Sequence, residues 1–188
     1  MIFSQDGKKA YVSNGGDATL SVIDTTKLEV TKTIPKVGKG AMGMVRSRDG
    51  KRLIVTGGGE NKVSIVDTGR DAVVKDLVHG KDAHGVALTP DGKHAWVPNR
   101  LSGDISIIDV TAGELVATIP NVGDKTDIIA ISPDGMRAFV TTRGEAQTGD
   151  PKIHSGKEPG ISVVDVKSRK LIKKVRLGGD PHGVAVRP

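Results

Sequence analysis

The hydrophobic residues of this chain are gathered in short, β-branched runs separated by polar turns, and this pattern recurs along the sequence. In each copy a Ser or Thr stands two positions before an Asp-Gly pair, and an apolar run ending in Val follows. The aspartates of these pairs lie 43, 42 and 43 residues apart, at Asp6, Asp49, Asp91 and Asp134. A period near 40–45 residues is typical of one four-stranded blade of a β-propeller.

A second apolar run confirms the period, because each copy of it ends in aspartate: Leu20–Asp24, Val63–Asp67, Ile105–Asp109 and Ile161–Asp165. The first three aspartates follow their Asp-Gly aspartate by 18 residues and the fourth by 31, so the fourth repeat carries a 13-residue insertion. We expect these strand-end carboxylates to accept backbone N–H groups of the following turn, which is a scaffold role.

The third repeat shows how one blade is organised. Strand A is expected at His84–Thr89, and the Asp-Gly turn joins it to strand B at Lys93–Pro98. Strand C is expected at Asp104–Asp109 and strand D at Leu115–Ile119. The sequence therefore predicts an all-β fold of four-stranded antiparallel blades. Residues 1–188 form a single propeller segment with blades at about 1–40, 41–82, 83–125 and 126–180, plus the first strand of a further blade at 181–188.

One position of strand B holds a large side chain in every repeat: Tyr11, Ile54, Trp96 and Phe139. Such a side chain fits the space between adjacent blades. We expect this set to form the core, rather than a cofactor site.

Strand B also carries a recognisable tetrapeptide. Tyr11-Val-Ser-Asn14 is the best copy, Trp96–Asn99 and Phe139–Thr142 are looser copies, and Gly85–Lys93 gives the preceding Gly-Val-Ala-x-Thr-Pro-Asp-Gly-Lys segment. With these residues the chain resembles the YVTN β-propeller repeat family, from whose tetrapeptide the first copy differs by Ser for Thr. The repeat is also similar to that of the cytochrome d1 haem-domain superfamily. The resemblance covers nearly the whole chain outside 143–159 and implies a periplasmic or cell-surface location.

The resemblance further implies a parent of about seven blades, within the usual range of four to eight. About four blades are present here, so we expect a partial ring within a longer polypeptide. Both Ile2–Ser4 and His182–Arg187 match a strand A, which speaks against a closed four-bladed ring. The expected partners are the remaining blades of a longer chain or further copies of this one.

The composition of the chain excludes several kinds of site and partner. Net charge is +6, but the basic residues lie in hairpin turns and outer strands, which is typical of a solvated rim and predicts no nucleic-acid partner. Cysteine is absent, so disulfides, thiolate metal sites and covalent c-type haem attachment are excluded within this segment. No apolar run approaches the roughly 18 residues of a membrane span.

Candidate binding residues gather at one end of the predicted channel. The side chains that open strand A in successive blades are Met42, His84, Asp127 and His182, and the inserted loop at 143–159 adds His154 and Glu158 on the same face. Each histidine has an alternative role as a hydrogen-bond partner of a neighbouring loop. Nothing has metal-ligand spacing, and the residues themselves predict neither a metal nor a cofactor.

Three functions remain open. The leading interpretation is a non-enzymatic binding module that presents its loop face to a protein, an envelope polymer or a small molecule, since no catalytic constellation is present. A haem-handling or redox propeller like the cytochrome d1 domain is the first alternative, with His84, His154 and His182 contacting the haem. A lyase or hydrolase with a histidine base and a divalent cation is the second alternative.

Overall fold

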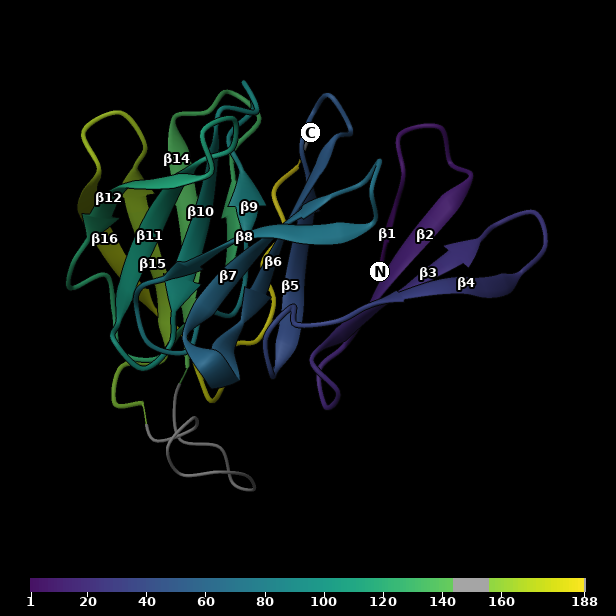
Figure 1. The fold of residues 1–188 in the computed structure, drawn as a ribbon. Coiled ribbons are helices and arrows are strands. Elements are labelled where there is room, and N and C mark those ends of the chain that lie inside the picture. The colour runs from purple at the N-terminus through teal and green to yellow at the C-terminus, as the bar shows by residue number, and fades with distance from the viewer. Residues whose placement is uncertain (144–155, 188) are drawn as a thin grey trace.

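The computed structural model describes residues 1–143 and 156–187. Four separate sheets follow one another along the chain, each of four antiparallel strands in sequence order (Figure 1). Within the described residues the only helical turn is η1 at Gly58–Glu60. The predicted all-β fold of four-stranded blades is therefore confirmed, with four blades present.

The strands have the following bounds. The first blade has β1 (Ile2–Phe3), β2 (Lys9–Asn14), β3 (Thr19–Asp24) and β4 (Glu29–Ile34), and the second has β5 (Ala41–Arg46), β6 (Arg52–Gly57), β7 (Lys62–Asp67) and β8 (Ala72–Val78). The third has β9 (Ala87–Leu88), β10 (His94–Asn99), β11 (Asp104–Asp109) and β12 (Glu114–Ile119). The fourth has β13 (Thr126–Ile131), β14 (Arg137–Thr142), β15 (Gly160–Asp165) and β16 (Lys170–Arg176).

The Asp-Gly turns connect the first two strands of each blade through one repeated set of bonds. In the fourth blade the Ser132 hydroxyl donates to Asp134 at 2.5 Å, and the Met136 N–H donates to the same carboxylate at 2.8 Å. Gly135 adopts φ +70°, which an L side chain disfavours. Because equivalent bonds occur in all four blades, the short polar motif alone fixes each hairpin.

The aspartates that end the third strand of each blade hold the next turn. Asp24 accepts the N–H groups of Thr26 and Lys27, both at 2.9 Å, and Asp67, Asp109 and Asp165 make similar bonds. The predicted scaffold role of these four carboxylates is confirmed.

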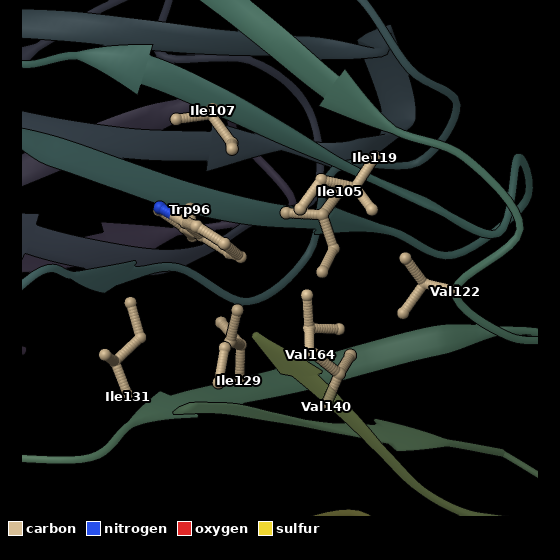
Figure 2. Packing of buried hydrophobic residues seen from close by; sticks show 10 residues of the cluster. Trp96, Ile105, Ile107, Ile119, Val122, Ile129, Ile131, Val140 and Val164 are labelled. Carbon is tan, nitrogen blue, oxygen red and sulfur yellow. The ribbon is translucent and has the colours of Figure 1, made fainter. Parts of the chain in front are cut away.

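The hydrophobic core lies between blades. Three clusters join the first blade to the second, the second to the third and the third to the fourth, and they are centred on Tyr11, Ile54 and Trp96 respectively. Figure 2 shows the third cluster, with Trp96 above Ile129 and Ile131, and Ile105 above Val140 and Val164. The strand B position predicted to fill these spaces is buried in three blades, while its fourth member, Phe139, is only half-buried.

The structure differs from the sequence prediction at two strands. Residues 181–187, predicted to begin a further blade, form no strand. The reason is that a strand A needs a neighbouring strand B, and β2 is already paired with β1 through Ile2 and Phe3. In the third blade strand A is reduced to Ala87–Leu88. The His84 N–H still donates to the Pro98 carbonyl of β10, but the His84 carbonyl and the Gly85 N–H bond to Thr56 and Asp127, outside that strand pair.

No helix in the described residues is long and apolar enough to cross a membrane.

Candidate functional site

His84 and Asp127, which lie at the start of the predicted strand A of the third and fourth blades, contact His182 of the C-terminal segment. Asp127, at the start of β13, is fully buried. One of its carboxylate oxygens lies 2.6 Å from Nδ1 of His182, and the other lies 3.2 Å from Nε2 of His84. Three of the predicted residues therefore form one cluster, and the two histidines approach opposite oxygens of a single carboxylate.

Close packing of the chain between blades brings these side chains together. The N–H of Gly85 donates to the carbonyl of Asp127 at 3.0 Å, and the carbonyl of His84 accepts the Thr56 hydroxyl at 2.5 Å. A Cβ on Gly85 would lie 2.7 Å from the Asp127 carbonyl oxygen. Glycine after the histidine therefore permits the approach that sets His84 beside Asp127.

Two arginines complete the cluster. A guanidinium nitrogen of Arg100 lies 3.6 Å from Asp127, and one of Arg143 lies 3.7 Å from it. Each also pairs with a second aspartate: Arg100 Nε with Asp82 at 2.8 Å, and Arg143 Nε with Asp180 at 2.8 Å. The result is an alternating row of aspartates and arginines across the third and fourth blades and the C-terminal segment.

The sequence analysis missed both arginines, although a signal for them exists. Arg100 and Arg143 each follow the last residue of a strand B, and their partners Asp82 and Asp180 each stand two residues before a histidine, in the Asp-x-His-Gly segments 82–85 and 180–183. A comparison of these positions between repeats would have drawn attention to the charged pairs.

Burial decides the charge state of the inner histidine. Loss of solvent lowers the pKa of His84 to about 4, and the neighbouring Asp127 carboxylate only partly opposes this. His84 is therefore neutral near pH 7. Its Nε2 and the facing oxygen of Asp127 are buried without a well-aligned hydrogen bond, which is costly for a fold unless it serves another purpose.

The outer histidine is the accessible member of the cluster. The His182 side chain is 58% exposed, and its Nδ1 is bound to the Asp127 carboxylate. A carboxylate on one ring nitrogen fixes the orientation of an imidazole and makes the other nitrogen a better ligand or acceptor. His182 is thus held with Nε2 available for a ligand.

The remaining predicted residues do not join the cluster. Met42 is the second residue of β5 and is 56% exposed, with no contact to Asp127 among the described interactions. Glu158 bonds Lys174 at 2.8 Å, which lowers the pKa of the Glu158 carboxyl. His154 lies outside the described residues. Within the described part of the chain no group of three or more His, Asp or Glu side chains is arranged to hold a metal ion.

Solved structures share this fold. Hydrazine synthase from Kuenenia stuttgartiensis matches with a TM-score of 0.80 and 22% identity, over 93% of this chain and 47% of that one. A putative 6-phosphogluconolactonase from Bacteroides uniformis matches with a TM-score of 0.77 and 18% identity, over 98% of this chain and 59% of that one. This chain therefore spans about half the length of these structures, and identities this low show the fold alone.

The amino-acid sequence matches one protein family. No curated protein matches the chain. The cytochrome D1 heme domain family matches residues 10–146, from the second strand of the first blade to just beyond the second strand of the fourth. The match covers well over half of the chain and includes four members of the Asp127 cluster, His84, Arg100, Asp127 and Arg143, but not His182. By this match the chain is a member of the cytochrome D1 heme domain family.

Proposed function

We propose that this chain is a non-enzymatic binding module that recognises an anionic group at the cluster of Asp127, His84, His182, Arg100 and Arg143. The observation that carries the proposal is the sharing of one fully buried carboxylate by two histidines and two arginines. A propeller blade does not need this arrangement, since the equivalent position of the second blade holds the exposed Met42.

Recognition of an anion would rest on hydrogen-bond donors and not on net charge, since three aspartates face the two arginines of the row. His182 presents a nitrogen to solvent, and the guanidinium groups of Arg100 and Arg143 lie around the same carboxylate. An arginine is a planar donor suited to carboxylates and phosphates. The ligand group can belong to a small molecule or to the surface of a protein or envelope polymer. The fold and family are common to propellers of many activities, so the site carries the proposal.

The test is a thermal-shift and calorimetric screen of small carboxylates and phosphates against wild type, His182→Ala and His94→Ala. His94 begins β10 at the Asp-Gly turn, away from the cluster, and is the matched control. We expect a ligand that stabilises wild type and the control, with at least about tenfold weaker binding to His182→Ala, or about 1.4 kcal/mol. The proposal is wrong if no compound binds wild type or if both variants bind alike.

Haem handling is the second candidate, and family membership together with the geometry of His182 favours it. An exposed imidazole whose other nitrogen is bound to a carboxylate fits the donor set of a haem iron. His182 would hold the iron through Nε2, and Asp127 would orient the ring. Bound haem would supply redox chemistry at this face of the module.

Titration with hemin, followed by visible absorption, separates this candidate from the first. Binding of haem by wild type and His94→Ala, with a changed iron-ligand spectrum in His182→Ala, supports haem handling. A wild-type protein that gives only the spectrum of free hemin removes it and leaves the anion site untouched.

Two finer assignments accompany this function. We infer that the repeats are of the YVTN type, which the tetrapeptides Tyr11–Asn14 and Trp96–Asn99 support. We also infer a periplasmic location, which membership in the cytochrome D1 heme domain family supports. Fractionation of cells that express the native gene would test the location.

A further inference from the structure

After the outermost strand of each of the first three blades, the chain crosses to the next blade through a closely packed glycine. Gly38, Gly80 and Gly123 each lie against the last residue of a strand B. A Cβ on these glycines would lie 2.9, 2.2 and 2.3 Å from atoms of Gly57, Asn99 and Thr142 respectively. The three crossovers are therefore equivalent, and the residues before the three glycines occupy one position.

This position is valine in the first and third crossovers and histidine in the second. Val37 and Val122 are fully buried, and each belongs to an apolar cluster between two blades. His79 takes the corresponding place between the second and third blades. Both of its ring nitrogens are shielded from solvent and have no hydrogen-bond partner among the described residues. Burying polar atoms without partners is costly, so packing alone does not explain a histidine here.

The surroundings of His79 favour its neutral form. Loss of solvent lowers the pKa of His79, and Asp104, at the start of β11, is the charged group that partly opposes this effect. The Asp104 carboxylate already accepts a hydrogen bond from Nδ2 of Asn99 at 2.6 Å. A proton on the ring would therefore place a cation where no free partner is available, which is unfavourable.

Residues 79–83, which we call the crossing segment, are bonded to the turn after β10. The Arg100 N–H donates to the carbonyl of Asp82 at 2.9 Å. The Leu101 N–H donates to the carbonyl of Lys81 at 3.0 Å. The crossing segment also carries the Asp82 carboxylate, which pairs with Nε of Arg100 at 2.8 Å. Release of the segment would therefore take Asp82 out of the row of aspartates and arginines.

We propose that His79 is a pH-sensitive switch that holds or releases the crossing segment. The neutral ring stays in the valine position and keeps the segment against the turn after β10. The protonated ring moves into water, and the segment opens with it. Any consequence for the Asp127 cluster rests on the proposed function, whereas the opening itself does not.

The direction of the pH effect follows from the burial of the ring. In the open state His79 meets water and titrates near pH 6.5, whereas burial lowers its pKa in the closed state. The open state therefore binds more protons, and opening becomes more favourable as the pH falls below about 6.5. The equilibrium constant of opening rises by at most about tenfold per pH unit.

Hydrogen exchange of two equivalent amides tests the proposal. The Leu101 amide bonds the Lys81 carbonyl at the histidine crossover, and the Gly59 amide bonds the Lys39 carbonyl at 2.9 Å at a valine crossover. The ratio of the two exchange rates removes the general effect of pH on exchange. We expect the ratio of Leu101 to Gly59 to rise about three- to tenfold between pH 7.5 and pH 5.5.

Two variants identify the group responsible. His79→Val introduces the residue of the other crossovers and should keep the ratio constant with pH. His84→Gln is the matched control, because it removes the other buried histidine of this region and leaves His79 in place; the rise should persist. A constant ratio in wild type, an equal rise in His79→Val or loss of the rise in His84→Gln overturns the proposal. These measurements use no ligand, so their failure is distinct from a failure of anion binding.

Discussion

At the scale of single residues, Asp127 is the most constrained side chain of the cluster. Its carboxylate is fully buried and surrounded by His84, His182, Arg100 and Arg143. Sequence reasoning selected Asp127 and both histidines because the repeat aligned them at the start of strand A. It missed the arginines because their position after strand B is held by glycine in the first two repeats, at Gly15 and Gly58.

We predict that Asp127→Asn destabilises the protein by about 3 kcal/mol, because the substitution leaves buried cationic groups without their shared carboxylate. Urea unfolding followed by circular dichroism measures the change. Asp17→Asn, in a surface turn, is the control and should change stability by less than about 0.5 kcal/mol. Equal effects of the two substitutions would show that the cluster contributes nothing to folding.

The pKa of His84 predicts a pH dependence. Its pKa falls to about 4 in the folded chain from about 6.5 in the unfolded chain. Between these values the unfolded chain binds more protons, so stability falls as the pH is lowered from about 6.5 to about 4, by up to about 1.4 kcal/mol per pH unit. Above about pH 6.5 His84 is neutral in both states, and its contribution to the free energy of unfolding is complete.

Urea unfolding at several pH values checks this slope, with His84→Gln as the comparison. The variant should lose less stability than wild type over the same interval. The carboxylates of the Asp-Gly turns do not interfere with this measurement, because hydrogen bonds lower their pKa below 3.8. The stability that depends on these carboxylates is therefore lost at a lower pH. Parallel curves for wild type and variant would contradict the assignment.

At the scale of elements, the hairpins could be predicted from the sequence, whereas the extent of the first strand of a blade could not. The Ser-x-Asp-Gly turns form through bonds between residues close in sequence, so the motif is sufficient. Strand A depends on partners far along the chain. The predicted strand at His84–Thr89 is reduced to two residues, because the His84 carbonyl and the Gly85 N–H bond to Thr56 and Asp127 of the adjoining blades.

Gly7 and Gly16 give a matched test of the turn. A Cβ at either position would meet nothing within 4 Å, but only Gly7 has a left-handed φ, of +72°. We predict that Gly7→Ala destabilises the first hairpin by about 1 kcal/mol, the cost of a side chain in that conformation. Gly16→Ala should be neutral within about 0.5 kcal/mol.

Hydrogen exchange of the β2 amides measures both variants. Faster exchange in Gly7→Ala alone is the expected result. Equal exchange in the two variants would mean that the positive φ is not a constraint in this turn.

At the scale of the whole molecule, stability lies between blades. Ile105 and Ile161 occupy equivalent positions, but Ile105 is buried by the next blade and Ile161 is half-buried. We predict that Ile105→Ala costs about 2–5 kcal/mol, as for other buried large-to-small changes. Ile161→Ala should cost less than half as much.

Urea unfolding makes this comparison. A cost for Ile161→Ala equal to that for Ile105→Ala would contradict the assignment of stability to the contacts between blades.

The sequence by itself determined the period, the hairpins, the strand-end aspartates and the propeller fold, because each depends on bonds between near neighbours or on a repeat visible in the letters. Only the tertiary structure decided that His84, Asp127 and His182 meet with Arg100 and Arg143, and that Phe139 lacks the cover given to Trp96. Both outcomes depend on how blades pack against one another. A local pattern does not encode the side chain that another blade places opposite it.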